Sequence, residues 1–186
     1  HVPETVSSVT APGRRERRKH ATRLELLSAG RRLFSAKGLY ESRIEDLSAA
    51  AGIAKGTIYG YFESKDELAR AVVETGYREL QDALRASVRA VRGRHERVGR
   101  IVRAHARFFE QHRDLLRVLH QARGMLKFDR PDWRPLRISL DGHVEVLIEL
   151  LGPGAAVPLP RALAREQART LFGAISGALS VQVALA

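Results

Sequence analysis

The spacing of apolar residues beyond residue 20 is that of α-helices almost throughout. Large apolar side chains recur three or four positions apart, and no stretch alternates apolar and polar residues as a half-buried strand would. Glycines and prolines fall between these patterned stretches, where helices end. A chain of 186 residues is also long enough to bury a sizeable core. The sequence therefore predicts an all-α fold.

The ends of several helices can be placed from short local patterns. Ser42–Glu45 and Ser64–Glu67 have the spacing of capping boxes, and Gly52 and Gly93 break the apolar pattern. Residues 1–20 form a polar tail that ends in a basic run, and we predict a disordered arm there. The predicted helices cover residues 21–37, 43–51, 54–61, 64–92, 95–112, 113–127, 136–151 and 160–186.

The charge of the chain narrows the class of partner. Lysine and arginine number 32 against 21 acidic residues, for a formal net charge of +11, which favours a polyanion such as nucleic acid. Cysteine is absent from the sequence, which excludes disulfides, cysteine-ligated metals and thiol nucleophiles. No apolar stretch is long enough to span a membrane and no signal peptide is visible, so we expect a cytoplasmic protein without membrane association.

The two short predicted helices joined at Gly52 have the pattern of a helix-turn-helix unit. On the second of them, Ile58 and Phe62 share the face toward the first helix, and Gly56 and Gly60 point outward. Each glycine costs about 1 kcal/mol relative to alanine within a helix. That cost is understandable if a ligand must approach the backbone closely, as DNA would.

The side chains beside these glycines suit such a ligand. Thr57 and Tyr61 flank them on one side, and Lys55 and Tyr59 on the other. Threonine, tyrosine and lysine all donate hydrogen bonds to phosphate. The alternative is a packed helical hairpin without a ligand, but the net charge and the adjacent basic tail favour DNA.

Residues 22–73 resemble the DNA-binding region of TetR-family transcription regulators, without insertion or deletion. The matching motifs are L-F-x-x-x-G, I-E-D-L-S-x-x-A-G and K-G-T-I-Y-x-Y-F-x-S-K-D-E-L. The resemblance implies an N-terminal three-helix DNA-binding domain at 21–66, after the arm at 1–20. It also implies a C-terminal helical domain at 67–186 for ligand binding and dimerisation.

Roles for individual residues follow from the same resemblance. Thr57, Tyr61 and Lys65 would donate to phosphates, and Arg43 would reach the DNA backbone or a base edge. The basic arm either remains a solvated, disordered segment or follows the DNA into the minor groove. The residues expected to contact DNA are Arg43, Lys55, Gly56, Thr57, Tyr59, Tyr61 and Lys65.

The last predicted helix is apolar on two faces. One stripe recurs about every 3.5 residues, and a second runs through Phe172 and Leu179. A helix of this kind must be buried on both faces, so one face can pack on its own domain and the other on a second copy, together with the helix at 136–151. The alternative is a single monomeric core. The residues expected at the dimer interface are Leu171, Ile175, Ala178 and Gln182.

Histidines and aromatic residues interrupt the apolar faces of the C-terminal half and indicate a candidate cavity. Such mixtures suit an adaptable, mostly apolar pocket with a few polar anchors, although histidines on apolar faces more often belong to the core. Arg103 or Arg107 could attract an acidic group, but such a run is more often a solvated face. No metal-binding pattern is present, so we expect no metal and no cofactor. The candidate ligand-binding residues are Arg103, His105, Phe109, Met125, Trp133 and His143.

Together these patterns and the resemblance predict a homodimeric, sequence-specific transcription regulator. It would be a repressor that binds a palindromic operator in double-stranded DNA and is released by a small lipophilic or anionic effector, although activation stays open. The alternative is a constitutive DNA-binding or architectural protein without an effector. An enzyme is not expected, because no nucleophile–base motif, phosphate-binding glycine loop or metal signature is present.

Overall fold

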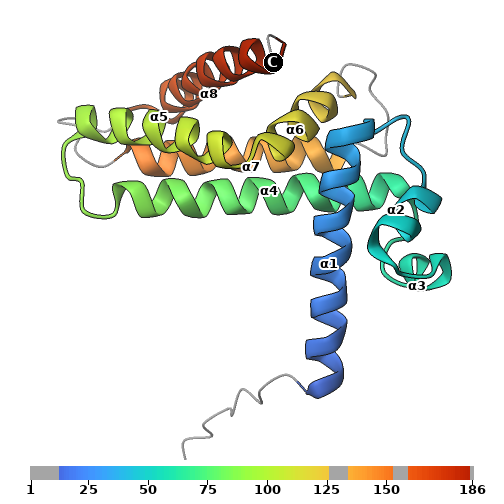
Figure 1. The fold of residues 1–186 in the computed structure, drawn as a ribbon. Coiled ribbons are helices and arrows are strands. Elements are labelled where there is room, and N and C mark those ends of the chain that lie inside the picture. The colour runs from blue at the N-terminus through green and yellow to red at the C-terminus, as the bar shows by residue number, and fades with distance from the viewer. Residues whose placement is uncertain (1–12, 126–133, 153–158, 185–186) are drawn as a thin grey trace, which may run out of the picture.

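A computed structural model describes residues 13–125, 134–152 and 159–184 of the chain, and these residues form eight α-helices and no strands. The all-α fold predicted from the periodicity is confirmed (Figure 1). None of these described helices is long and apolar enough to span a membrane. The helices are α1 (Arg14–Lys37), α2 (Ile44–Ala51), α3 (Lys55–Tyr59), α4 (Lys65–Val88), α5 (Arg94–Gln111), α6 (Arg113–Met125), α7 (Arg134–Leu151) and α8 (Arg161–Ala184).

Helix α4 is the long axis on which the other helices assemble. One end of α4 adjoins α2 and α3, and α5 and α7 pack along its remaining length (Figure 1). Helix α6 lies between α4 and α1, while α8 covers α5, α6 and α7. Tyr77, Leu84 and Leu147 are among the buried residues that join these layers into one continuous core. Because no flexible linker separates α4 from α3, the two ends of the molecule are mechanically connected.

The structure corrects the expected disordered arm for its last seven residues. Helix α1 begins at Arg14 rather than at 21, and residues 14–20 are exposed on a segment that projects beyond the rest of the molecule (Figure 1). Arginine, lysine and alanine are good helix formers, and no helix breaker stands between Gly13 and the apolar part of the helix. Residues 1–12 lie outside the described part of the chain.

The two expected capping boxes have different outcomes. At the start of α4, the Ser64 hydroxyl accepts a hydrogen bond from the Glu67 N–H at 3.1 Å, as predicted. At the start of α2 the cap is shifted by one residue, because the Arg43 N–H donates to Asp46 Oδ2 at 2.8 Å. The Ser42 hydroxyl instead donates to a backbone carbonyl four residues earlier. Helix α2 therefore begins at Ile44.

Helix α8 has one face in the core and another in solvent. Ile175 is 9% exposed and belongs to the core, and Leu171 packs against that core. Ile175 therefore lies on the face that the protomer itself covers and not on a face for a second copy, whereas Leu171 is only partly buried and stays a predicted interface residue. Ala178 is exposed as expected, and the Gln182 side chain lies outside the described part of the structure. Exposed small or apolar residues in the second half of α8 include Gly173, Ala174, Gly177, Ala178 and Val181.

Candidate functional site

A tight turn at Gly52 fixes α3 against α2. Gly52 has φ +65° and ψ +26°, the left-handed conformation that glycine adopts at little cost, and its N–H donates to the Ser48 carbonyl. The Ser48 hydroxyl donates to the carbonyl of Ile53 at 2.8 Å and holds the turn closed. Ile58 and Phe62 are 0% and 1% exposed, so the inward face of α3 is the one predicted. These contacts hold α3 in a fixed position on the domain.

The opposite face of α3 is open. Lys55, Gly56, Thr57 and Tyr59 are all exposed, and half of the Tyr59 surface is accessible. A Cβ added at Gly56 would meet no heavy atom within 4 Å. A rigid helix therefore presents a cation, a hydroxyl and a phenol around bare backbone, which suits close approach by a phosphate chain and by base edges.

Lys55 has a partner within the protein. Its Nζ lies 2.7 Å from Glu45 Oε1 of α2, and this hydrogen bond raises the pKa of Lys55 and lowers the pKa of Glu45. Both side chains are about half exposed, so solvent and salt screen the pair. The ammonium group of Lys55 can therefore exchange this carboxylate for a phosphate at little cost.

The remaining predicted DNA contacts lie on both sides of α3. Arg43 is exposed at the first turn of α2, and Tyr61 is half-buried against the core. Lys65, at the start of α4, donates from Nζ to the Tyr40 carbonyl at 3.1 Å. The Tyr40 side chain is 62% exposed and was not predicted as a contact. The one feature of the sequence that could have indicated Tyr40 is that an aromatic residue stands in the polar loop between the first two helices.

The C-terminal domain brings His105 of α5 and His143 of α7 together. Their Nε2 atoms are 3.4 Å apart, and His105 Nδ1 lies 3.0 Å from the Ile101 carbonyl oxygen. The two side chains are at most 1% exposed. Burial lowers the pKa of His105, and burial together with His105 and Arg123 lowers the pKa of His143 to about 3. Both imidazoles are therefore neutral at physiological pH.

Beside this pair, α4, α5, α6 and α8 enclose a narrow cavity that contains His105 and Phe109, as predicted. The space open to the centre of a water molecule is only about 10 Å³. Arg103 is exposed and lies back over Gly99, so it does not reach the cavity. The Met125 side chain and Trp133 lie outside the described part of the structure. Three further lining residues were not predicted from the sequence: Tyr77, Arg123 and Phe172.

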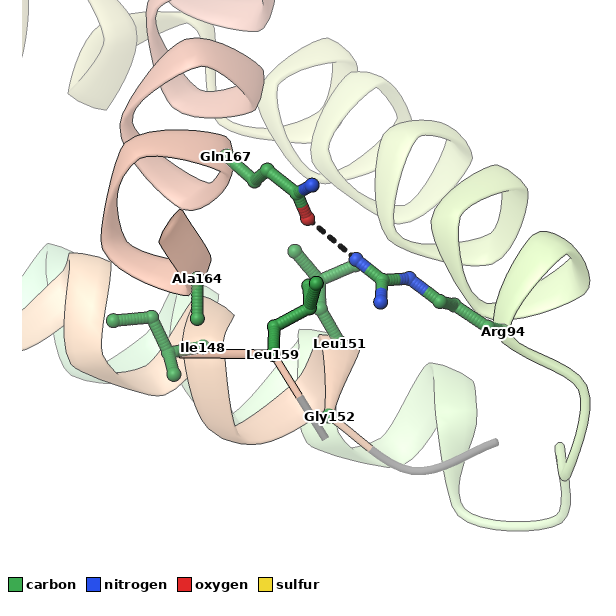
Figure 2. Close-up of a pocket in the computed structure, with 7 residues that line it drawn as sticks. All are labelled: Arg94, Ile148, Leu151, Gly152, Leu159, Ala164 and Gln167. Carbon is green, nitrogen blue, oxygen red and sulfur yellow. Dashed lines mark hydrogen bonds between the residues drawn. The ribbon is translucent and has the colours of Figure 1, made fainter. Parts of the chain in front are cut away.

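A second hollow lies at the end of α4 remote from α3. It holds about 180 Å³ among the first turn of α5, the last turn of α7 and the start of α8. Figure 2 shows Arg94 reaching across it to Gln167, with Nη2 2.5 Å from Oε1, above the apolar side chains of Leu151 and Leu159. The hollow is open to solvent and contains no titratable group other than Arg94, so its chemistry is less specific than that of the histidine cavity.

Helix α6 connects the histidine cavity with the N-terminal domain. Arg31 of α1 forms a bidentate pair with Asp114, both oxygens at 2.7 Å, and its Nη2 also lies 3.0 Å from His112 Nδ1. Farther along α6, Gln121 Oε1 accepts a hydrogen bond from the Leu39 N–H at 2.9 Å. Burial alone would raise the pKa of Asp114, but its hydrogen bonds from Arg31 and the Leu115 N–H lower it. The helix that contributes Arg123 to the cavity is thus bonded to the helix that supports α3.

Comparison with known proteins agrees with this two-domain arrangement. Residues 26–72 match the model of the family described as bacterial regulatory proteins, tetR family. The HTH-type transcriptional repressor DhaR of Mycobacterium sp. (strain GP1) is 30% identical over 66 residues, which are 36% of this chain and 33% of that protein. The chain thus spans about a third of the length of that relative.

Two solved structures share the fold over most of the chain. The fatty acid degradation regulator FadR from Bacillus halodurans has a TM-score of 0.74 at 20% identity and covers 94% of this chain and 86% of its own. FadR from Bacillus subtilis, in complex with stearoyl-CoA, has a TM-score of 0.73 at 18% identity and covers 86% of each chain. Residues 26–72 thus match the tetR family of bacterial regulatory proteins, while the chain as a whole shares the fold of the two FadR structures.

Proposed function

We propose that this chain is a transcription repressor that binds a palindromic DNA operator as a homodimer and releases it when a small molecule enters the C-terminal domain. Such a regulator acts in the cytoplasm, where the bacterial chromosome lies. The observation that carries the proposal is the open face of α3, where Lys55, Thr57 and Tyr59 surround the unobstructed backbone of Gly56. A DNA major groove admits a helix of this kind.

Charge supports DNA as the ligand of that face. The start of α1 carries exposed basic residues on the same domain as α2 and α3. Arg43 and Lys65 add cations on either side of α3, and the chain as a whole has a net charge of +11. Phosphate contacts of this kind supply most of the affinity, and the few side chains on α3 supply the sequence preference.

A homodimer follows from the exposed faces of the last two helices. Ile138 of α7 is 67% exposed and Val181 of α8 is 57% exposed, and the exposed face of α8 before Val181 contains small residues that permit close helix packing. A two-fold axis through this surface would pair each protomer with one half-site. The two α3 helices would then lie about 34–36 Å apart, one turn of DNA.

Release by an effector is supported by the connection through α6. A ligand that separated α6 from α8 would displace α6, and the Arg31–Asp114 and Leu39–Gln121 hydrogen bonds would pass that displacement to α1. The B. subtilis FadR structure, which has the same fold, contains stearoyl-CoA and shows that this fold accommodates an effector-sized molecule. Because coupling is reciprocal, the effector and DNA must weaken each other's binding by the same factor.

The test is selection from a pool of randomised DNA duplexes by the full chain. We expect enrichment of a palindromic motif, and we expect the paired change Lys55→Ala with Tyr59→Ala to abolish that enrichment. Arg103→Ala with Val102→Ala is the matched control, because these residues are also exposed but lie on α5. The proposal is wrong if the chain enriches no motif, or if the variant with both Lys55→Ala and Tyr59→Ala enriches the same motif as the wild type.

A further inference from the structure

Arg123 is a cation without an anionic partner among the residues that the structure describes. Its Nε atom is buried and makes no hydrogen bond. Its Nη2 is 3.5 Å from the Tyr77 hydroxyl, and its guanidinium carbon lies 4.7 Å from the centre of the Phe172 ring. The hydrogen bond is long, and the ring stabilises the cation without neutralising it. Arg123 as a whole is only partly buried, but its buried Nε is a donor without an acceptor, which lowers stability and leaves a hydrogen bond for a ligand to make.

The neighbouring histidines cannot supply further positive charge. The Ile101 carbonyl can only accept, so His105 Nδ1 carries the proton and the Nε2 of this neutral ring is an acceptor. His143 Nε2 therefore donates to it across 3.4 Å, which leaves His143 Nδ1 unprotonated, buried and without a partner. The pKa of His143, lowered to about 3, agrees with a neutral ring. Arg123 is thus the only permanent cation among the residues that line the cavity; the third lining histidine, His120, is exposed and lies with Nδ1 3.2 Å from Ser180 Oγ.

Apart from His120, Ser176 and Ser180, the rest of the cavity is apolar. Its walls include Phe109, Leu116, Leu119, Ile175 and Leu179, beside the ring of Phe172. One water molecule would fill the present space of about 10 Å³, but a neutral water would leave the charge of Arg123 uncompensated. The described residues also contain no group of three or more metal-ligating side chains, so the histidine pair does not belong to a metal site of that kind.

We propose that this cavity binds a monocarboxylate with an apolar body. The carboxylate accepts hydrogen bonds from Arg123 Nε and from the Tyr77 hydroxyl, and the apolar body enters between α6 and α8 against Phe109 and Phe172. One negative charge matches one guanidinium, whereas a phosphate dianion would bring a second charge that nothing in the cavity neutralises. The inference rests on the proposed function, because it identifies the chemical class of the effector for that same site.

The experiment is calorimetric titration of the full chain with two acids, octanoate and 4-phenylbutyrate, and with their uncharged amides. Octyl phosphate is the dianionic comparison. We expect at least one acid to bind with one molecule per protomer, at least tenfold more tightly than its amide and than octyl phosphate. Equal binding of acid and amide, tighter binding of octyl phosphate, or no saturable binding of either acid would overturn the inference.

Three variants test whether Arg123 is the partner of the carboxylate charge. Arg123→Met keeps the length of the side chain and removes its charge, so it should reduce the preference for acid over amide to less than threefold. Arg103→Met, an exposed change in the same domain, should leave the preference intact. Arg123→Lys should keep part of the preference, which guards against a general folding effect in the methionine variant. An undiminished preference in a folded Arg123→Met protein would also overturn the inference.

DNA selection with the same proteins separates this inference from the proposed function. A chain that selects its duplex but binds neither acid is a DNA-binding protein with a different effector or none. A chain that binds an acid through Arg123 but selects no duplex retains the carboxylate site and lacks the proposed regulatory role. Arg123 lies outside the DNA-binding domain, so Arg123→Met should select the same duplex as the wild-type chain.

Discussion

At the residue scale, the behaviour of the DNA-facing surface depends on the partners that its side chains have before DNA arrives. Lys55 is held by Glu45 at 2.7 Å, and Lys65 is held by the Tyr40 carbonyl. Glu45 also places a negative charge beside the surface that DNA would approach. DNA binding must therefore exchange these contacts, so the groups that compete with phosphate influence affinity as well as those that donate to it.

Substitutions of Lys55 and Glu45 should change DNA affinity in opposite directions. Lys55→Ala should weaken binding of any duplex and reduce the slope of log affinity against log salt by about 0.9, the value for one phosphate contact. Glu45→Gln should strengthen binding severalfold, because it frees Lys55 and removes a charge that repels DNA. Fluorescence anisotropy at several salt concentrations measures both, with Glu96→Gln on α5 as the control. Weaker binding by Glu45→Gln would contradict this role.

The buried histidines make stability depend on pH. The pKa of His143 is about 3 in the folded chain against 6.5 as its ordinary value, so below pH 6.5 the unfolded chain takes up a proton that the folded chain does not. Stability should therefore fall as the pH falls from about 6.5 toward 3, at up to about 1.4 kcal/mol per pH unit from this group. His105, whose pKa burial also lowers, acts in the same direction. The Tyr77 ring, whose own pKa is raised by burial, lies 5.4 Å from the His143 ring, and Arg123 places a positive charge beside the pair.

Urea unfolding at pH 7 and pH 5 tests this expectation. His143→Gln can still donate to His105 but does not titrate, so it should lose less stability between the two pH values than the wild-type chain. His95→Gln removes an exposed histidine at the start of α5 and should behave like the wild type. If His143→Gln and the wild type lost the same amount of stability between pH 7 and pH 5, this buried ring would not control the acid sensitivity of the fold.

At the element scale, contacts between distant segments determine how the helices cooperate. Arg31 and Asp114 are 83 positions apart, and Leu39 and Gln121 are 82 apart, yet both pairs fasten α6 to the N-terminal domain. Arg97 is buried and donates to the Leu150 carbonyl at 2.7 Å and to carbonyls at the end of α4. It satisfies backbone oxygens that helix ends otherwise leave unpaired.

Asp114→Asn tests whether α6 passes displacement to the DNA-binding domain. The amide cannot pair with Arg31 as a carboxylate does, and because Asp114 is partly exposed we expect a loss of only about 1 kcal/mol of stability. Carboxylate binding at Arg123 should be unchanged, but its effect on duplex affinity should shrink. Asp82→Asn, at an exposed pair within α4, is the control. If carboxylate binding reduced duplex affinity as much in Asp114→Asn as in the wild type, a contact other than Arg31–Asp114 would transmit the displacement.

Local patterns in the sequence predicted the helices but not the contacts between them. The periodic apolar residues located seven of the eight described helices closely, and Gly52 and Ser64 marked a turn and a cap correctly. The start of α1 was missed because residues 14–20 contact no core, so no apolar spacing marks them. Neither Arg97 nor Arg123 was singled out from the sequence, because only the packing of α5 and α6 on other helices shows their buried atoms.

For the candidate sites too, local patterns predicted some features, while others depend on how the helices pack. The outward residues of α3 could be predicted, because helix geometry and the turn at Gly52 fix their direction. His105 and His143 could be named as interruptions of apolar faces, but their 3.4 Å approach depends on how α5 packs on α7. The stripe on α8 was assigned to the wrong side at Ile175, since periodicity alone does not tell which of two apolar faces the protomer itself covers.

At the scale of the whole molecule, the proposed function requires two copies. The exposed face of α8 contains small residues, and Ile138 of α7 adds an exposed apolar side chain. Ala178→Arg would place a charge on that face and should convert a dimer to monomers that bind one half-site weakly. Ala90→Arg, at an exposed position after α4, should stay dimeric. Sedimentation velocity measures both, and a wild-type monomer at micromolar concentration would contradict the dimer.

The central claim is that α3 and its surroundings are the DNA-binding surface, and hydrogen–deuterium exchange of the full chain with and without its selected duplex tests it most directly. We expect DNA to slow exchange at residues 43–65 and at the basic start of α1, and to leave the exchange rates around the exposed arginines of α5 unchanged. Slowed exchange confined to α5, with residues 43–65 unaffected, would contradict the claim.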